Sequence, residues 1–395
     1  MNDTIKIKDT CYIANTYNRY PLYATHGNGC LIVDDEGKTY IDFTSGIGVT
    51  GLGHCFKPWV EATTKQLNNL EHISNLFYTK PAIDVAEKLC KKTTMNRVFF
   101  ANSGAEANEG AIKVARKYAQ DSNKHERCEI ITLTNSFHGR TLAALSATGQ
   151  DSFHQNFGPF VSGFQYAQAN NLEDLEKKVS AKTLAIMIEI VQGEGGVLPL
   201  TKAYLDKVQN ICDHQDILLI IDEVQTGIGR CGSLFAYMQY GLHPDIVTCA
   251  KGLGNGLPIA AILLGNKCAD TLKFGDHGTT YGGNPVACAG ASVVLDYMND
   301  DLYNHVNQMG NLLSTKISKM KYVKSVSGMG LMLGIEIDEA IDIKNVILQC
   351  MQKGVILLSA KNKLRLLPPL IISKEEVEEG LAILEAVLLK LGDKK

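Results

Sequence analysis

Short apolar segments that alternate with helical patterns constrain the fold of this chain more than any other feature of its sequence. Six segments are nearly unbroken runs rich in Ile, Leu and Val, which is typical of strands buried on both faces of a parallel sheet. Amphipathic patterns between them, such as residues 104–119 and 201–213, predict helices. We therefore expect an α/β chain in which helices cover a wound, mainly parallel sheet. The predicted strands are residues 97–101, 128–133, 184–190, 217–222, 246–249 and 261–264.

The two ends of the chain carry a different pattern. Near the N-terminus, the apolar residues 31–33 and 39–43 flank a polar turn that ends at Gly37, which predicts a β-hairpin. Beyond a glycine-rich stretch at residues 275–290 we expect a helix, two strands and a last helix that begins with a capping box. These later elements are predicted at residues 291–319, near 331–337, near 364–367, and after the capping pair Ser373 and Glu376.

This change of pattern predicts two domains. Residues 58–285 are expected to form a large domain around the wound sheet. Residues 1–57 and 286–395 are expected to form a smaller α+β domain, built from both ends of the chain. A chain of 395 residues buries roughly three quarters of its unfolded surface, which is enough for both cores.

Composition excludes several classes of protein. The formal net charge of −3 gives no electrostatic basis for binding nucleic acid. The N-terminal segment MNDTIKIKDT lacks the apolar core of a signal peptide, and the longest apolar runs, such as residues 257–265, are far shorter than the ~20 residues that span a bilayer. The 11 cysteines include no C-x-x-C pair, which is typical of reduced thiols, and the ten histidines show no metal-binding spacing. We therefore expect a cytoplasmic protein with no membrane, nucleic-acid or metal partner.

Two segments match the G-x-G-x-x-G pattern of dinucleotide-binding sites, residues 46–51 and 227–232. The next helix after the first segment is predicted to start near Pro58, too late to place its N-terminus on a pyrophosphate. The second segment follows an acidic strand end and does not open a helix. A nicotinamide-dependent oxidoreductase built on residues 46–51 therefore stays an alternative from a different class of enzyme.

Three separate features follow predicted strands and carry chemistry. Residues 102–108 read NSGAEAN, where Ser103 caps a helix and the small residues Gly104 and Ala105 leave backbone N–H groups open to an anion. Asp222 ends the most apolar strand, where an acid can pair with a buried cation. Lys251 follows another strand among glycines and small residues, which makes it a candidate Schiff-base nucleophile.

Together these features predict a site for pyridoxal 5′-phosphate. The phosphate would lie on the helix N-terminus at Gly104 and Ala105, and Lys251 would bind the aldehyde. Asp222 would keep the pyridine nitrogen protonated, so that the ring can accept electrons. Each feature alone has an ordinary structural explanation, namely a capped helix, a strand-end acid and a solvated lysine. Their combination in one wound sheet favours the cofactor site.

The same segments resemble the signature of the class III (ω-amino acid) aminotransferases. The resemblance runs over essentially the whole chain and is carried by residues 222–232, 244–254, NSGAEANE at 102–109, SFHGRT at 136–141, VQGEGGV at 191–197 and HGTTYGGNP at 277–285. It implies the fold-type I architecture of pyridoxal-phosphate enzymes. It also implies a homodimer whose active sites are shared between the two subunits.

The resemblance assigns further residues to the cofactor. It implies that Phe137 lies on one face of the ring and Val224 on the other, and that Gln225 bonds the ring hydroxyl. Thr280 would reach the phosphate of the other subunit, and Thr279 would lie beside the substrate. These roles add to those of Gly104, Ala105, Asp222 and Lys251.

The resemblance also implies four substrate-binding residues. Arg140 would bind the α-carboxylate of the amino donor, for which a planar guanidinium is well suited. Tyr17 would line the substrate channel. Arg365 would bind the α-carboxylate of glutamate or 2-oxoglutarate, and Glu194 would mask Arg365 when the other donor is bound.

Within the family, Asn15–Arg19 and the segments SGI and LGH in residues 45–54 are similar to the enzymes that use N²-acetylornithine and 2-oxoglutarate in arginine biosynthesis. Other donors stay open, namely ornithine, succinyl-diaminopimelate and 4-aminobutyrate, as does a binding protein of this fold that has lost catalysis. The chain departs from the family pattern at Phe56-Lys57, which bears on the substrate-side loop. It departs at four further positions that remove no chemical group: Ile190, Cys231, Asn255 and Ala260.

Overall fold

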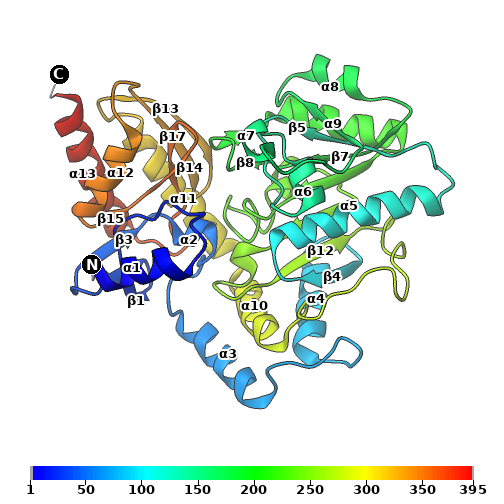
Figure 1. The fold of residues 1–395 in the computed structure, drawn as a ribbon, viewed down its shortest axis with the longest axis horizontal. Helices are drawn as coiled ribbons and strands as arrows, with labels where there is room; N and C mark the ends of the chain where they lie inside the picture. The colour runs from blue at the N-terminus through cyan, green and yellow to red at the C-terminus, as the bar shows by residue number, and fades with distance from the viewer. Residues whose placement is uncertain (1–2, 394–395) are drawn as a thin grey trace.

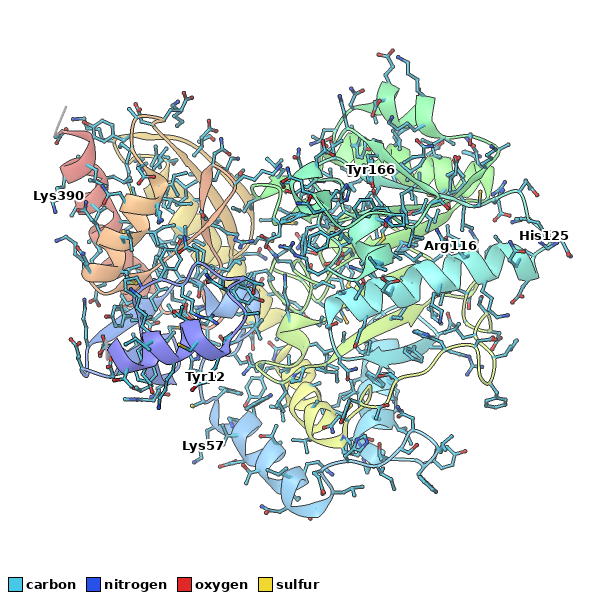
Figure 2. The ribbon with its side chains drawn as sticks, in the orientation of Figure 1. Tyr12, Lys57, Arg116, His125, Tyr166 and Lys390 are labelled. Carbon is cyan, nitrogen blue, oxygen red and sulfur yellow. The ribbon has the colours of Figure 1, made fainter. Side chains whose placement is uncertain are left out.

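The computed structural model describes residues 3–393 and arranges them in two parts. A large sheet with its helices lies on the right of Figure 1, and two smaller sheets with the helices of both chain ends lie on the left. Charged side chains of the outer helices, such as Lys57 and Lys390, point away from the body, as does His125 in the turn after the helix at residues 104–121 (Figure 2). Among the described residues, no helix combines the length and apolarity needed to cross a membrane.

The large sheet has seven strands, and all six strands predicted for it are confirmed. β12 runs antiparallel to both of its neighbours and the other strands are parallel to one another, so the sheet is mainly parallel. The strand β6 was not predicted, because it is short, lies at the edge and alternates partly buried with exposed residues. The order across the sheet is β4 (Arg97–Ala101), β12 (Ala260–Leu264), β11 (Ile246–Cys249), β10 (Leu218–Asp222), β7 (Thr183–Ile188), β5 (Glu129–Leu133) and β6 (Phe164–Ala167).

Both faces of this sheet are covered, which explains the unbroken apolar runs of its strands. Along β10, Leu218 and Ile220 belong to one buried cluster, whereas Leu219 and Ile221 belong to the other. Successive side chains of a strand point to opposite faces, so each run supplies two cores at once. The helices of this part are α3 (Lys57–Asn69), α4 (Lys80–Lys92), α5 (Gly104–Asp121), α6 (Leu142–Ala147), α7 (Asp151–His154), α8 (Leu172–Lys178), α9 (Lys202–Gln215) and α10 (Pro285–Tyr297).

The two ends of the chain meet in the smaller sheets. The N-terminal hairpin is confirmed as β2 and β3, and β3 pairs in parallel with β15 from the C-terminal region. One sheet has the order β1 (Ala24–Asn28), β2 (Leu31–Asp34), β3 (Thr39–Asp42) and β15 (Val355–Ile356). The other has the order β13 (Val323–Met329), β14 (Met332–Ile337), β17 (Lys363–Leu366) and β16 (Leu358–Ala360).

Helices α1 (Asp3–Tyr12), α2 (Ser45–Gly48), α11 (Asp300–Ile317), α12 (Ile343–Gln352) and α13 (Lys374–Gly392) accompany these sheets (Figure 1). The last helix has the predicted capping box, in which Ser373 and Glu376 bond each other's backbone N–H groups. The remaining short elements are β8 (Val191–Gln192), β9 (Leu198–Pro199), η1 (Ala236–Tyr240) and η2 (Lys251–Leu253). The division into domains at residues 57/58 and 285/286 stays a prediction.

The single helix predicted over residues 291–319 is wrong, because the chain forms two helices there. α10 ends at Tyr297, and α11 begins behind Asn299, whose side chain accepts a hydrogen bond from Leu302 N at 3.1 Å. Asn299 is a good N-cap, and the acids Asp300 and Asp301 suit the positive end of the new helix. α10 packs against α3 and α4, whereas α11 packs against α13 and the strands β13 and β14.

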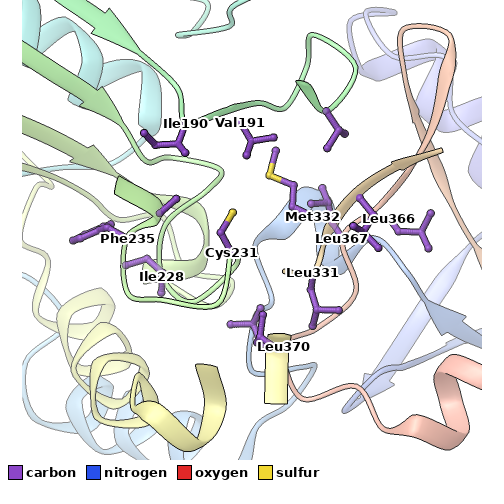
Figure 3. Packing of buried hydrophobic residues seen from close by; sticks show 14 of the residues in the cluster. Ile190, Val191, Ile228, Cys231, Phe235, Leu331, Met332, Leu366, Leu367 and Leu370 are labelled. Atoms are coloured by element: carbon purple, nitrogen blue, oxygen red, sulfur yellow. The ribbon is translucent and has the colours of Figure 1, made fainter. Parts of the chain in front are cut away.

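A continuous hydrophobic cluster joins the two parts. In Figure 3, Ile228 and Phe235 of the large part lie on one side of Cys231, and Leu331 and other residues of the small part lie on the other, all within one cluster. Nearby, the buried Arg230 donates hydrogen bonds to the carbonyl oxygens of Leu331 and Pro368 and to Ser45 Oγ. The glycine-rich segment 227–232 therefore forms part of the contact between the two parts.

Candidate active site

A cavity of about 400 Å³ opens where several strands of the large sheet end. The segments that follow β4, β5, β7, β10 and β11 all contribute to its lining, which is where ligands bind in sheets of this type. The lining includes nine of the predicted site residues or their neighbours: Ser103, Gly104, Ala105, Phe137, Arg140, Asp222, Val224, Gln225 and Lys251.

The N-terminus of α5 faces this cavity and offers unused backbone donors. Ser103 caps the helix, because its Oγ accepts from Glu106 N at 3.2 Å and its carbonyl oxygen accepts from Ala107 N at 3.0 Å. Within the described residues, the amides of Gly104 and Ala105 have no acceptor. The absence of a side chain at Gly104 matters, because a Cβ there would lie 2.6 Å from Val224 Cγ1. This helix end is therefore suited to an anion.

Asp222 forms the floor of the cavity and is held by three donors. Its Oδ2 accepts from Asn108 Nδ2 at 2.7 Å and from His138 Nδ1 at 2.8 Å, and its Oδ1 accepts from Val224 N at 2.9 Å. Thr248 Oγ1 in turn donates to Asn108 Oδ1 at 2.7 Å, which fixes the orientation of that amide. The carboxylate is 3 % exposed, so its charge acts in a weakly polar environment.

Asp222 also affects the protonation of the neighbouring His138. Burial by itself lowers the pKa of His138, but the hydrogen bond and charge of Asp222, together with the charge of Glu189, outweigh it and raise the pKa above its ordinary value. His138 Nε2 is buried and has no partner among the described residues. Sequence reasoning missed both His138 and Asn108, although they lie inside the quoted segments SFHGRT and NSGAEANE.

Lys251 lies in the cavity on the one-turn segment η2, directly after β11. Its backbone has φ 44°, a left-handed conformation that costs a lysine about 1–3 kcal/mol and is typical of residues held for function. Burial lowers the pKa of the Lys251 ammonium, and Arg365 lowers it further, whereas Glu194, Asp222 and Glu189 raise it by less. A lysine with a lowered pKa is more often neutral and is therefore a better nucleophile.

The aromatic and cationic residues predicted around the ring also line the cavity. Phe137 and Val224 both lie in its wall, on segments that follow different strands. The exposed Arg140 lies at the edge of the wall, with its guanidinium carbon 4.2 Å from the ring centroid of Phe153 and 5.5 Å from that of Phe137. Stacking on two aromatic rings holds the guanidinium in place while leaving its N–H groups free to bind a carboxylate.

Glu194 and Arg365 form an ion pair, so the predicted pairing is present. Arg365 Nη1 donates to Glu194 Oε1, which also accepts from Gln225 Nε2 at 3.2 Å. The Arg365 side chain is 3 % exposed and the Glu194 side chain is 27 % exposed. Burial alone would raise the pKa of Glu194, but the charge and hydrogen bond of Arg365 lower it below its ordinary value. The pair is therefore charged at neutral pH.

Five predicted residues do not line the cavity that contains Lys251. Glu194 and Arg365 lie next to it, because both are within hydrogen-bond distance of Gln225, which lines it.

The other three predicted residues are Tyr17, Thr279 and Thr280. Tyr17 is 70 % exposed and stacks near Arg19, whose guanidinium carbon lies 5.5 Å from the ring centroid. Thr279 is one hydrogen bond away from the cavity, because its Oγ1 accepts from Asn102 Nδ2 at 3.2 Å. Thr280 lines a separate cavity of about 680 Å³ together with Thr279.

Glu189 is a third residue that sequence reasoning missed. It follows β7, is 5 % exposed and lines the cavity. Burial raises the pKa of this carboxyl to about 7; the charge of His138 lowers it and that of Asp222 raises it. Glu189 lies shortly before the segment QGEGG, but the sequence alone does not show that it faces the cavity. That becomes clear only once the order of the strands in the sheet is known.

The residues present fit pyridoxal phosphate. Two unused amides at a helix N-terminus suit the phosphate, and a lysine with a lowered pKa suits the aldehyde. A buried carboxylate on the cavity floor suits a protonated ring nitrogen. Among the described residues there is no group of three or more His, Cys, Asp and Glu placed to hold a metal ion.

Comparison with known proteins agrees with this chemistry. The family model "Aminotransferase class-III" matches residues 12–388. The acetylornithine aminotransferase of Haemophilus ducreyi is 52% identical over 99% of this chain and 100% of its own length, and that of Caldanaerobacter subterraneus is 47% identical over 96% and 98%.

Solved structures of aminotransferases are also similar to this chain. The ornithine aminotransferase of Toxoplasma gondii has a TM-score of 0.95 at 30% identity, covering 100% of this chain and 96% of its own. A second structure of that enzyme is described with partial occupancy of PLP at its active site. The N-acetylornithine aminotransferase of Stenotrophomonas maltophilia has a TM-score of 0.85 at 34% identity, covering 99% and 100%. With its lysine, aspartate and helix N-terminus in one cavity, the chain belongs to the class III aminotransferases, a family of pyridoxal-phosphate enzymes.

Proposed function

We propose that this chain transfers the δ-amino group of N²-acetylornithine to 2-oxoglutarate, giving N-acetylglutamate semialdehyde and glutamate, as a step of arginine biosynthesis in the cytoplasm. The observation that carries the choice of donor is the set of relatives named acetylornithine aminotransferase, which are 40% to 52% identical over nearly the whole chain. The separation of two arginines in the site, Arg140 exposed and Arg365 paired with Glu194, supports it.

The chemistry common to both donors would use Lys251 and Asp222. When bound, pyridoxal phosphate supplies a ring that accepts electrons as a proton leaves the reacting carbon. Lys251 Nζ would first hold the cofactor and, once displaced by the donor amine, would take that proton and return it to the neighbouring carbon. Asp222 would keep the ring nitrogen protonated, since its carboxylate is buried and already oriented by Asn108 and His138.

The remaining lining residues would orient the cofactor. The amides of Gly104 and Ala105 would bind the phosphate. Phe137 and Val224 would lie on the two faces of the ring. Gln225 would bond the ring hydroxyl, since its amide already lies between the ring cavity and the Glu194–Arg365 pair.

The substrate-binding residues would distinguish the two donors. Acetylornithine presents a terminal amine, with its carboxylate at the far end of the chain, where Arg140 would bind it. Glutamate presents an amine and a carboxylate on the same carbon, and Arg365 would bind that carboxylate once Glu194 releases it. A single site can serve both half-reactions in this way because the charge of Arg365 is covered when no carboxylate is present.

We also propose a two-fold dimer in which each subunit lends Thr280 to the phosphate site of the other. Thr279 and Thr280 lie apart from the cavity of their own chain and line a second cavity together with the exposed Leu76 and Phe274. Phe77 and Tyr78, which follow Leu76 in the chain, and Tyr281, which follows Thr280, are also exposed. Exposed apolar side chains of this kind favour contact with another protein surface. Tyr17, also exposed, would line the substrate channel of the assembled dimer.

Ornithine is the second candidate donor, because structures of ornithine aminotransferases match this chain with a TM-score of 0.95. Succinyl-diaminopimelate and 4-aminobutyrate are the two remaining candidates. A panel of these four donors with 2-oxoglutarate as acceptor tests the proposal. Acetylornithine should give the highest kcat/KM, and a higher value for another donor would replace it.

A further inference from the structure

Glu189 bonds two different loops with its two carboxylate oxygens. It lies at the carboxyl end of β7, between the ends of β5 and β10 in the sheet. Its Oε2 accepts from Phe137 N at 3.0 Å, in the loop that follows β5. Its Oε1 accepts from Gly193 N at 3.4 Å, in the loop that follows β8. One side chain therefore connects two segments that are 56 residues apart at Phe137 and Gly193.

Each of these loops carries a predicted site residue. The first contains Phe137 and Arg140, which line the cavity. The second contains Glu194, next to Gly193. Glu194 bonds Arg365 and the lining residue Gln225. The loops also meet away from the cavity, because Gln192 Nε2 donates to Thr134 O at 2.9 Å. The second loop crosses so close to Gln225 that a Cβ at Gly193 would collide with that side chain. The position of the Gly193 amide therefore determines where the backbone of Glu194 lies.

A carboxylate is the side chain that this geometry requires. Two N–H groups from different loops converge on Glu189, and a carboxylate has an acceptor for each, whereas an amide has only one. The group is nearly buried, and among the described residues it forms no ion pair. Burying a carboxyl group without an ion pair destabilises a fold. We therefore attribute the presence of Glu189 here to the two loops that it holds.

We propose that Glu189 is a positioning residue that fixes the ring-stacking loop of Phe137 and the Glu194 loop relative to each other. The part of this inference that concerns donors rests on the proposed function. Glu189 itself acts through the backbone amides of the two loops. Its loss would let Glu194 move away from Arg365, which would harm the donor that needs Arg365 covered more than the donor that binds to it.

The first test is hydrogen exchange of the two amides, which needs no substrate. In Glu189→Gln, one of the two acceptors becomes a donor, so exchange of at least one of the Phe137 and Gly193 amides should accelerate by roughly tenfold or more. Gln192→Met is the matched control, since it removes the loop contact outside the cavity and should leave both amides within about twofold of the native rate. Peptides from α9 report any general loosening. Unchanged exchange of both amides in Glu189→Gln, or equal acceleration in the control, would overturn the proposal.

The second test separates reach from charge. Glu189→Asp keeps the charge but is one methylene too short to bond both loops. Single-turnover rates with acetylornithine should fall relative to those with glutamate by about tenfold in both Glu189→Asp and Glu189→Gln. A native ratio in Glu189→Asp would show that charge, not position, is what the site uses, and would refute the inference. If Glu189→Gln loosens the whole fold, the donor ratio of Glu189→Asp still tests the proposal.

The two proposals fail in different ways. A native protein that does not accept acetylornithine would refute the proposed donor and leave the exchange result intact. Unchanged exchange in Glu189→Gln, in a protein that does accept acetylornithine, would refute the role of Glu189 alone.

Discussion

Replacing Glu194 with alanine is the sharpest test of how one cavity can serve two donors. In the structure Glu194 Oε1 accepts from Arg365 and from Gln225, and Arg365 is almost completely buried. Glu194→Ala leaves the guanidinium without its counter-charge whenever no substrate carboxylate is present. Acetylornithine brings no carboxylate to this position, whereas glutamate does. We therefore expect the half-reaction with acetylornithine to slow, and that with glutamate to stay the same or become faster.

The size of the effect follows from the burial of the two side chains. Removing one partner of a fully buried pair costs about 3–5 kcal/mol. Glu194 is 27 % exposed, and Gln225 Oε1 still lies 3.4 Å from Arg365 Nη1, which together reduce the expected cost. We take about 2 kcal/mol as the difference between the two donors, which corresponds to roughly a thirtyfold change in the ratio of their rates.

The assay is a single-turnover measurement on the cofactor-loaded enzyme, with each donor added alone. The ratio of the two rate constants is compared between the native protein and Glu194→Ala, and cofactor content serves as the control for folding. Arg365→Ala should shift the ratio in the opposite direction, sparing acetylornithine and slowing glutamate. Equal losses for both donors in both variants would refute the selection mechanism and leave the pair as a structural salt bridge.

Four further predictions concern the same cavity and its surroundings. Lys251→Ala should lose turnover and the visible absorbance of the bound cofactor; borohydride reduction and peptide mapping of the native protein should place the cofactor on Lys251, and another lysine would contradict this. Asp222→Asn should keep the fold and much of the cofactor but lose about a hundredfold or more in kcat, because an amide does not stabilise a protonated ring nitrogen as a carboxylate does; near-native turnover would reduce Asp222 to a structural role. The active protein should sediment as a dimer, and Thr280→Ala should weaken cofactor binding; a fully active monomer would rule out shared sites. Burial raises the pKa of Glu223 to about 7 in the folded protein, so this acid releases its proton at a lower pH when the chain is unfolded. The free energy of unfolding should therefore fall as the pH rises from about 4.5 to 7. Glu223→Gln should make this fall shallower, as measured by urea titrations at several pH values.

The sequence predicted those parts of the fold that depend on local pattern. The run at β10 is apolar from Leu218 to Ile221 because both faces of the sheet are covered, and such a run can be identified without knowing its neighbours. The edge strand β6 exposes Gln165, so its pattern does not differ from that of a loop. The break between α10 and α11 was missed although Asn299 is a good cap, because apolar residues continue on both sides of it.

The site residues also divide into those that local pattern predicts and those that it does not. Lys251, Asp222 and the amides of Gly104 and Ala105 follow strands directly, so the general rule for ligands in wound sheets was enough to find them. Asn108 and His138 matter because both reach the same oxygen of Asp222, from positions 114 and 84 residues away in the chain. Contacts of this kind depend on strand order and helix packing, which no local pattern contains.

The rigid and variable parts of the cavity match what two different donors require. The proton transfer is common to both half-reactions, and its proposed residues lie directly at strand ends; Asp222 there is nearly buried and held by three donors. Donor selection differs between the half-reactions, and its proposed residue Glu194 lies on a loop with glycine on either side and keeps 27 % of its surface exposed. The proposed release of Arg365 would need only the Glu194 side chain to turn, so the backbone held by Glu189 and the carboxylate of Asp222 would stay in place.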